Sequence, residues 1–400
     1  MPDRSENVRS LAELLVRFGA NVQPGQVVAL SSEPGKESVA RAVAEAAYQA
    51  GARFVDLQVF DVYLKRARAL YADPDTLTFV PPWYGQRMLA LSEARAARIV
   101  LSGPVAPRIM DGIDPELAGR DMLPAIRESI AVVNERTTNW TIGPCPTAGW
   151  AKLVHPSLDD SSALELLWQQ IARVCRLDEA DPVAAWMQRL DQLVRAAERL
   201  DALALDSLHF TGPGTDLTIG LLATSRWLCG RFETASGLPH APNLPTEEVF
   251  TTPDPERVSG TVRATKPLFT SGRMITGLRV SFEGGRAVRI DADEGAETLR
   301  SLSRRDPGAA RLGEVALVDR EGRIGPLQTV FYDTLLDENA ASHIALGQGF
   351  KFAVDESDAG RINTSEVHID FMIGGDEVEV TGTTRDGREL PLLRRGAWQI

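Results

Sequence analysis

The stretch V-V-A-L-S-S-E-P-G-K, residues 27–36, decides the fold of the first half of the chain. Its apolar run at residues 27–30 ends in turn-forming residues, and a helical pattern at residues 38–50 follows and stops at Gly51. Residues 53–59 form the next apolar segment. A strand, a helix and a second strand in this order predict two parallel strands joined by a crossover helix.

The same alternation continues further along the chain. The pattern predicts a helix at residues 87–97 and a strand at residues 98–101, and Asp114 and Pro115 are suited to the N-cap and first position of another helix. Strands separated by helices of this length are typical of a doubly wound sheet. We therefore predict an α/β protein whose N-terminal domain, residues 1–178, is a doubly wound and mostly parallel sheet domain.

The second half of the chain has a different pattern. A helical segment at residues 179–203 is followed by short apolar segments that turns separate. Residues 278–282 and 287–290 alternate on either side of the turn E-G-G-R, which predicts a β-hairpin. The C-terminal domain, residues 179–400, is therefore expected to be mixed α+β and rich in antiparallel strands.

Composition and short motifs exclude several functions. The net charge is −12 and no basic region offsets it, so neither nucleic acid nor an anionic membrane is expected as a partner. The first residues lack the apolar core of a signal sequence, and no run approaches the ~20 apolar residues of a membrane span, so the expected location is cytoplasmic. No G-x-G-x-x-G follows the first strand, and the Gly35-Lys36 pair lacks the earlier glycine of a phosphate loop. A nucleotide cofactor is therefore not expected.

Two segments near the C-terminus carry the residues best suited to bind a metal. E-N-A-A-S-H at residues 338–343 and H-I-D at residues 368–370 hold two of the five histidines, each within a few residues of a carboxylate. Side chains alternate along a strand, so His368 and Asp370 are expected on one face. Imidazole nitrogen and carboxylate oxygen are ligands of zinc and similar ions, so these segments indicate a metal site and metal-assisted hydrolysis.

Two glutamates further upstream extend the candidate set. Glu248 follows a proline-containing turn and precedes an apolar strand, and Glu314 stands near the start of the apolar run L-G-E-V-A-L. A buried charge is costly unless it is neutralised, which a metal ion would do. Each signal alone also fits an ordinary surface or structural residue, and their coincidence favours a site. The other histidines, His155, His209 and His240, lack such settings and are expected to be structural or on the surface.

Six segments carry more information in combination than any of them does alone. They are N-W-T-I-G-P-C-P-T-A-G-W-A-K (139–152), G-P-G-T-D-L (212–217), N-L-P-T-E-E-V-F (243–250), L-G-E-V-A-L-V (312–318), D-E-N-A-A-S-H (337–343) and H-I-D-F-M-I-G (368–374). In this order they resemble the M29 family of metallo-aminopeptidases, of the aminopeptidase T, aminopeptidase S and PepS type. The resemblance covers nearly the whole chain.

The resemblance implies a two-metal site in the C-terminal domain. Carried over by motif, the metal ligands are Glu248, Glu314, His343, His368 and Asp370. Glu314 is the expected bridge between the two ions, and Glu338 matches a further acidic position, as a ligand or as the general base. The implied cofactors are two divalent ions per chain, which are zinc, cobalt, manganese or magnesium. The implied activity is removal of N-terminal residues from short peptides, by a homodimer.

One position departs from the family pattern and leaves alternatives open. Seven residues after His343, where the family usually has a tyrosine thought to stabilise the transition state, this chain has Phe350. Phenylalanine keeps the ring but lacks the hydroxyl donor, so a metal-binding homologue with impaired peptidase activity is one alternative. A mononuclear non-haem iron ring-cleaving dioxygenase is another, because His343, His368 and Asp370 also form a set of two histidines and one carboxylate. The two upstream glutamates favour two metals and hydrolysis.

Overall fold

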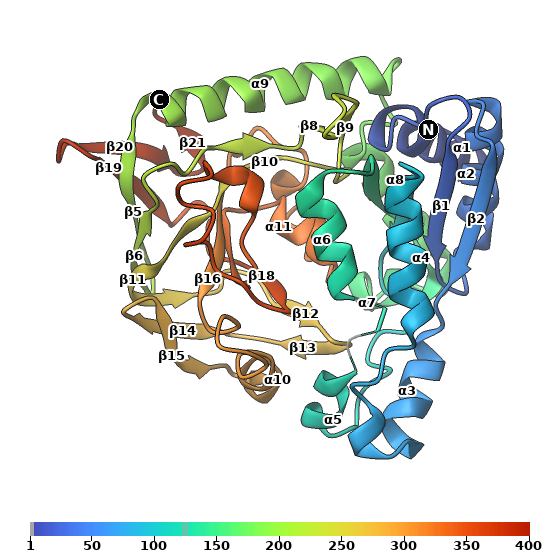
Figure 1. The fold of residues 1–400 in the computed structure, drawn as a ribbon, viewed down its shortest axis with the longest axis horizontal. Coiled ribbons are helices and arrows are strands. Elements are labelled where there is room, and N and C mark those ends of the chain that lie inside the picture. The colour runs from blue at the N-terminus through green and yellow to red at the C-terminus, as the bar shows by residue number, and fades with distance from the viewer. Residues whose placement is uncertain (1–3, 122, 125) are drawn as a thin grey trace. The chain divides into compact units, whose positions relative to one another are not determined.

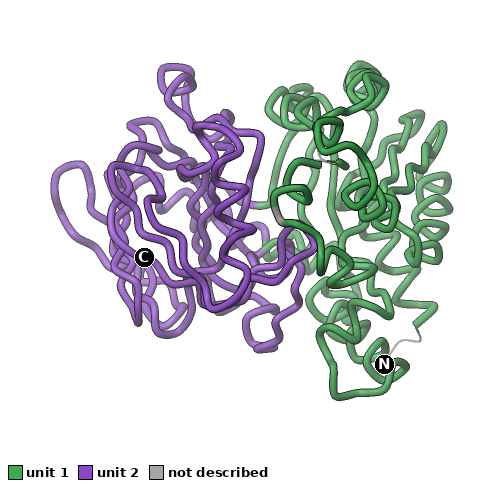
Figure 2. The backbone as a smooth tube through the Cα atoms, turned by 90° about the horizontal axis from the view of Figure 1, so that it is seen from below, with its two compact units in different colours: residues 1–189, 230–246 green, residues 190–229, 247–400 purple. Residues whose placement is uncertain are grey.

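The computed structural model of the chain describes residues 4–121, 123–124 and 126–400. The chain forms two compact units, coloured separately in Figure 2, which comprise residues 1–189 with 230–246 and residues 190–229 with 247–400. These units are defined by compactness and not by independent folding, so the predicted domains 1–178 and 179–400 stay a prediction.

The first unit is built around a parallel sheet of four strands (Figure 1). Its strands are β1 (Val27–Ser32), β2 (Phe54–Val59), β3 (Ala97–Ser102) and β4 (Trp140–Pro144), in the order β2-β1-β3-β4. The chain adds β2 on one side of β1 and then crosses to the other side, which is a doubly wound arrangement. The predicted parallel sheet is confirmed.

The helices of the first unit complete the α/β pattern. α2 (Glu37–Gln49) connects β1 to β2 and buries the face that carries Val39, Val43 and Ala47, at the spacing of an amphipathic helix. The other helices are α1 (Arg4–Leu14), α3 (Val62–Tyr71), α4 (Pro82–Glu93), α5 (Pro115–Arg120), α6 (Arg127–Glu135), α7 (Ala148–Val154) and α8 (Asp160–Val174), with the single turns η1 (Leu15–Gly19) and η2 (Pro74–Thr76). A small two-stranded sheet, β8 (Phe232–Glu233) and β9 (Pro239–His240), also belongs to this unit.

Helix α4 lies earlier in the chain than the expected residues 87–97. Its first residue is Pro82, whose fixed φ suits the first turn of a helix and whose missing N–H costs nothing there. Just beyond its end, Arg95 has a φ of 48°, in the left-handed region where helices commonly stop. The helix therefore leaves room for β3, which begins one residue before the expected strand.

A long helix, α9 (Pro182–Ala202), contributes residues to both units. It lies within the helical segment expected at residues 179–203. Within the described residues, no helix combines the length and the apolar character that a transmembrane segment needs.

The second unit contains an antiparallel sheet of eight strands in the order β15-β14-β11-β6-β5-β19-β20-β21. These strands are β5 (Leu205–Gly212), β6 (Thr215–Leu221), β11 (Pro253–Arg263), β14 (Arg279–Glu283), β15 (Arg286–Asp291), β19 (Glu379–Thr384), β20 (Glu389–Arg394) and β21 (Ala397–Trp398). β14 and β15 form the hairpin that the sequence predicts. Its turn contains Gly284 and Gly285, both with positive φ, as a tight hairpin requires.

A second antiparallel sheet, of five strands, carries most of the candidate site residues. Its strands are β7 (Leu228–Cys229), β10 (Glu248–Thr251), β16 (Leu312–Val318), β17 (His343–Gly347) and β18 (His368–Met372), in the order β18-β17-β16-β10-β7. The unit is completed by β12 (Leu268–Thr270), β13 (Arg273–Ile275), α10 (Ala296–Leu302), α11 (Thr334–Glu338), η3 (Gly325–Leu327) and η4 (Lys351–Ala353). All seven residues of β16 are buried, so any charge on this strand is buried with them. The predicted mixture of helices with antiparallel strands is confirmed.

Candidate metal centre

Strand register brings three predicted site residues onto one face of the five-stranded sheet. Ala345 of β17 pairs with Glu314 of β16 on one side and with Asp370 of β18 on the other. Residues that pair across strands point to the same face. Glu314 and Asp370 therefore flank an alanine, whose small side chain leaves space between the two carboxylates. His368 lies two residues before Asp370 on β18, so it shares this face, as predicted.

The remaining two predicted ligands extend the same face. His343 pairs with Ala316, two residues after Glu314 on β16. Glu248, the first residue of β10, pairs with Val318 on the other side of β16, again two residues further along. All five predicted ligands consequently start from one face, although they come from four strands that are widely separated in the sequence (Figure 1).

The ligand atoms of these residues form two overlapping groups. Glu248, Glu314 and His343 make the first group, and Glu314, His368 and Asp370 make the second. Within each group, one nitrogen or oxygen from each residue lies within 4.8 Å of the others. Glu314 belongs to both groups, which is the position that a bridging carboxylate would take. His368 is the most accessible of the five, with 27% of its side chain exposed.

Backbone carbonyls orient both histidines. Nδ1 of His343 lies 3.2 Å from the carbonyl oxygen of Ala341, and Nδ1 of His368 lies 2.8 Å from that of Gln348. A carbonyl only accepts, so each Nδ1 carries the proton, and each neutral ring presents the lone pair of Nε2. A hydrogen bond from the ring nitrogen that does not face the metal, here Nδ1, is typical of metal-binding histidines.

The Nε2 atoms face carboxylate oxygens, which creates a need for a cation. Nε2 of His343 lies 3.0 Å from Oε2 of Glu248, and Nε2 of His368 lies 3.0 Å from Oε2 of Glu314. Among the described residues, no donor makes a hydrogen bond of ordinary geometry to the buried Oε2 of Glu248. Two lone pairs this close repel unless a proton or a metal ion lies between them. The donor set of imidazole and carboxylate fits a divalent cation.

The pKa shifts describe the same excess of negative charge. The pKa of Glu314 is raised to about 7, mainly by burial; the hydrogen bond to His368 opposes the rise, and the charges of Asp370 and Glu248 add to it. Burial lowers the pKa of His343, but the neighbouring carboxylates outweigh burial and raise that pKa to about 10. The pKa of Asp370 is lowered, because the attraction of His368 outweighs the effect of burial. In the protein without metal, protons therefore supply the positive charge that a cation would supply.

Glu338 belongs to neither group and lies at the C-terminal end of α11, which packs against β18. Burial raises the pKa of Glu338 well above its ordinary value, and the charges of Asp370 and Glu248 raise it further. Its neighbour Asn339 donates to Oε1 of Glu338 at 3.4 Å. Glu338 is thus placed close enough to sense the ligand carboxylates, and it holds a proton more readily than an exposed glutamate.

Phe350 lies beside the second group, after the end of β17. Its ring centroid is 5.2 Å from that of His368, and 5.5 Å and 5.2 Å from those of Phe250 and Phe352. The position at which the family is expected to have a tyrosine therefore does face the site, and the missing hydroxyl concerns the site directly.

Two supporting residues escaped the sequence-based prediction. The side chain of Asn339 accepts from the backbone N–H of Glu247 at 2.6 Å and donates to the carbonyl of Leu335 at 2.9 Å, so it joins the start of β10 to α11. Its position within E-N-A-A-S-H is the signal that could have found it. The backbone carbonyl of Gln348 accepts a hydrogen bond from His368. Because every residue has such a carbonyl, the sequence gives no signal for this role.

Comparison with known proteins identifies the family. The model of the family described as thermophilic metalloprotease (M29) matches residues 4–398 of the chain. The chain belongs to the M29 metalloprotease family. Its predicted membership is thereby confirmed, and this M29 protein is a hydrolase.

Individual M29 relatives match over the full length. Aminopeptidase T from Thermus aquaticus is 42% identical over 405 residues, covering 99% of both chains. Aminopeptidase PepS from Streptococcus thermophilus is 36% identical, covering 100% of both. The structure of wild-type AmpT from Thermus thermophilus matches with a TM-score of 0.90 and 40% identity, covering 100% of both chains. These matches give no support to a ring-cleaving dioxygenase or to a homologue with impaired peptidase activity.

Proposed function

We propose that this M29 protein removes N-terminal residues from short peptides with the help of two divalent cations. The observation that carries the proposal is the membership of Glu314 in both ligand groups, since a carboxylate has two oxygens and can serve two ions. Glu248 and His343 would complete the first position, and His368 and Asp370 the second. The names of the relatives, aminopeptidase T and PepS, support the substrate class.

Two bound cations would supply a water of lowered pKa, polarisation of the scissile carbonyl and a partner for the free α-amine. The chain itself contributes orientation and proton transfer. The carbonyls of Ala341 and Gln348 hold both imidazole rings in the tautomer that leaves Nε2 free. The alanines and the glycine that alternate with the ligands on β16 and β17 keep the face open above the sheet.

Glu338 is the proposed general base. A carboxylate oxygen of Glu338 would accept a proton from the attacking water and deliver it to the nitrogen of the leaving amine. The raised pKa of Glu338, caused by burial and by nearby carboxylates, suits a group that must hold this proton between the two steps. Asn339, which donates to its Oε1, would fix the orientation of the carboxylate.

The donor set narrows the choice of metal. Each proposed position combines one imidazole nitrogen with carboxylate oxygens, a mixture that zinc, cobalt and manganese accept. Magnesium, the fourth predicted ion, prefers a shell of oxygens and is the least suited of the four. We also propose a cytoplasmic location for this protein.

The homodimer is likewise a proposal, supported by an exposed apolar surface on the first unit. Six large side chains on α3, on α4 or between them are more than half exposed: Tyr63, Leu64, Tyr71, Phe79, Trp83 and Leu89. Large apolar side chains that are exposed in this number are common at protein interfaces. Sedimentation of the wild type and of the Tyr71→Glu/Trp83→Glu double variant tests the idea: the wild type should be a dimer and the variant a monomer. A monomeric wild type would contradict it.

The proposed function is tested by removing and restoring metal. Protein stripped with a chelator should lose hydrolysis of leucine p-nitroanilide, and activity should return and saturate near two equivalents of zinc, cobalt or manganese per chain. A matched substrate with an acetylated amine should not be cleaved, because it lacks the free α-amine. Full activity without metal, or saturation at one equivalent, would overturn the two-metal proposal.

A further inference from the structure

Three phenylalanine rings form an aromatic cluster beside the second ligand group. Phe350 packs edge-on against Phe250, stacks on Phe352 with an interplanar angle of 24°, and lies 5.2 Å from the ring of His368. Phe250 belongs to the face of the sheet that carries the ligands, because it pairs with Ala316, which pairs in turn with His343. Phe350 and Phe352 are only partly buried, so they present apolar surface next to the site.

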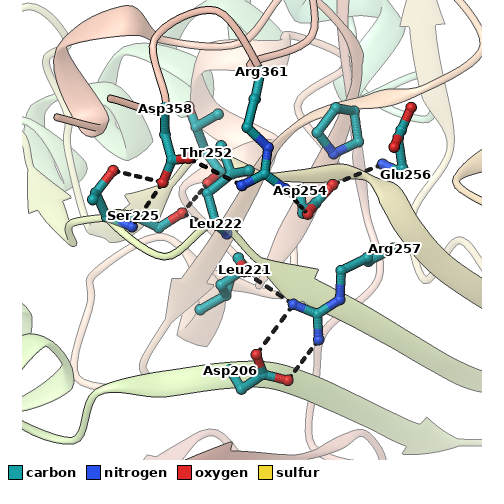
Figure 3. Close-up of polar contacts among 12 residues, drawn as sticks. Asp206, Leu221, Leu222, Ser225, Thr252, Asp254, Glu256, Arg257, Asp358 and Arg361 are labelled. Atoms are coloured by element: carbon teal, nitrogen blue, oxygen red, sulfur yellow. Dashed lines mark hydrogen bonds and ion pairs between the residues drawn. The ribbon is translucent and has the colours of Figure 1, made fainter. Parts of the chain in front are cut away.

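One buried threonine holds this cluster in place through the backbone of Phe350. The hydroxyl of Thr252 accepts from the N–H of Phe350 at 2.9 Å and donates to its carbonyl oxygen at 3.2 Å. Thr252 has no exposed surface, and its own carbonyl accepts from the hydroxyl of Ser225 at 2.7 Å. Figure 3 shows Thr252 and Ser225 in this network. Both backbone groups of Phe350 are thus tied to the junction between β10 and β11.

A second tether fixes the segment that follows Phe352. Arg361 donates to Asp254 at 2.9 Å and to Asp358 at 3.0 Å, as Figure 3 shows. Asp254 lies on β11, two residues after Thr252, and only 4% of it is exposed. Asp358 also accepts from the N–H and the hydroxyl of Thr224. The aromatic cluster therefore sits between two anchored points and is positioned before any ligand arrives.

We infer that Phe350 and Phe352 form the wall that receives the side chain of the substrate's N-terminal residue, and that they select apolar side chains. The inference rests on the proposed function. A residue whose α-amine is held at the ligand group carries its side chain on the adjacent carbon. The partly exposed ring of Phe350 lies 5.2 Å from that of His368, and the ring of Phe352 stacks on Phe350 and continues the same apolar surface. Neither ring has a polar atom, so a charged side chain would lose its hydration there without compensation.

Thr252 is a positioning residue in this account, because it acts through the backbone of Phe350. Valine has the shape of threonine but no hydroxyl, so Thr252→Val removes both hydrogen bonds and leaves the volume nearly unchanged. Thr252→Ser keeps the hydroxyl and is the conservative rescue. A purely structural role of Thr252 would change stability or overall rate, but it would not change the preference between two substrates.

The test compares the preference for leucine over alanine p-nitroanilide, expressed as a ratio of kcat/KM, in the metal-loaded enzyme. Phe352→Ala should lower this ratio by about 10-fold or more, the scale expected for several methylene groups in an apolar pocket. Thr252→Val should lower it in the same direction, and Thr252→Ser should restore it. The matched control Phe54→Ala makes the same change on the exposed edge strand β2 and should leave the ratio as it is.

Calorimetric binding of L-leucine and L-alanine to the same variants gives a second readout that does not depend on turnover. The binding preference for leucine should fall in Phe352→Ala as the kinetic ratio does. Suppose that the wild type cleaves arylamides but that Phe352→Ala and Thr252→Val keep the wild-type kinetic ratio and the wild-type binding preference. The proposed wall is then refuted, and the proposed function stands. If the wild type cleaves no aminoacyl arylamide at all, the proposed function itself fails.

Discussion

Nε2 of His368 lies 3.0 Å from Oε2 of Glu314, while Nδ1 of the same ring is already committed to a backbone carbonyl. The contact joins two strands that are not neighbours, since β17 lies between β16 and β18. A close pair of acceptors across a sheet is stable only when a cation or a proton joins them. His343 and Glu248 make the same kind of contact in the other group, at 3.0 Å, and Glu314 belongs to both groups.

Replacing Glu314 with glutamine should abolish double occupancy. Glu314→Gln keeps the shape of the side chain but removes the charge that both groups share. We expect the number of bound divalent ions to fall from two to one or fewer, and kcat/KM to fall by more than the roughly 100-fold that outer-shell partners alone cost. Metal analysis per chain and steady-state rates measure this. Glu297→Gln, on the exposed side of α10, is the control; two ions in Glu314→Gln would contradict the bridge.

Asn339 offers a test of the support behind the ligands. Asn339→Ala leaves the buried N–H of Glu247 without its 2.6 Å acceptor and removes the donor to Glu338. Metal affinity should fall about 10- to 100-fold, and the free energy of unfolding should drop by about 1–3 kcal/mol. Metal titration and urea unfolding provide the two values. An unchanged affinity would show that Asn339 stabilises only the fold.

Restoring a hydroxyl at position 350 should raise the rate. Phe350→Tyr adds a donor to a ring that already lies 5.2 Å from His368. Where an oxyanion donor is missing, its return is worth roughly 10²–10³ in kcat. The gain should appear in kcat, with the number of bound metal ions unchanged. If kcat does not rise, another group already donates to the transition state, and the loss of the tyrosine does not limit activity.

His240 should make the first unit less stable in acid. Burial lowers the pKa of His240 to about 4, and its Nε2 has no hydrogen-bond partner among the described residues. In the unfolded chain the ring takes up a proton near pH 6.5, whereas the folded chain resists until about pH 4. Stability is therefore lost as the pH falls through this window, by about 2 kcal/mol between pH 8 and pH 5.

Urea unfolding of the wild type and of His240→Phe at these two pH values measures the effect. The phenylalanine ring can keep the packing against Trp140 and Phe232, whose centroids lie 6.4 Å and 6.1 Å from that of His240. The loss of stability between pH 8 and pH 5 should be about 2 kcal/mol smaller in the variant. An equal loss in both proteins would assign the acid sensitivity to other groups.

Local patterns were sufficient for much of the fold. The apolar run at residues 27–30, its turn and the following helical spacing correspond to β1 and α2. The alternation around E-G-G-R corresponds to the hairpin of β14 and β15. Helix α4 begins before the expected residue 87 because Pro82 suits the first position of a helix. Patterns of this kind depend on neighbours in the chain, which is why the sequence reveals them.

Local sequence patterns predicted only part of the candidate site. The alternation of side chains along a strand predicts that His368 and Asp370 share one face, and both lie on the same face of β18. The pairing of Ala345 with both Glu314 and Asp370 depends on register between distant strands, which no local pattern specifies. The family resemblance supplied the set of ligands, and the structure supplied the register. The backbone carbonyl of Gln348 was beyond prediction, because every residue has one.

The hydrogen bonds of Thr252 and the ion pairs of Arg361 hold the segment that begins at Phe350 independently of the metal ligands. Binding of the substrate side chain is thereby separated from binding of metal. The metal ligands lie on strands of a buried sheet, where a substitution disturbs the paired strands on either side. Phe350 and Phe352 lie instead on a connection between strands, and connections tolerate substitution more readily. Thr252 and Asp254 fasten that connection from outside, mainly through its backbone and one arginine. New substrate preferences could therefore arise by exchange of Phe352 alone, while the metal ligands stay unchanged.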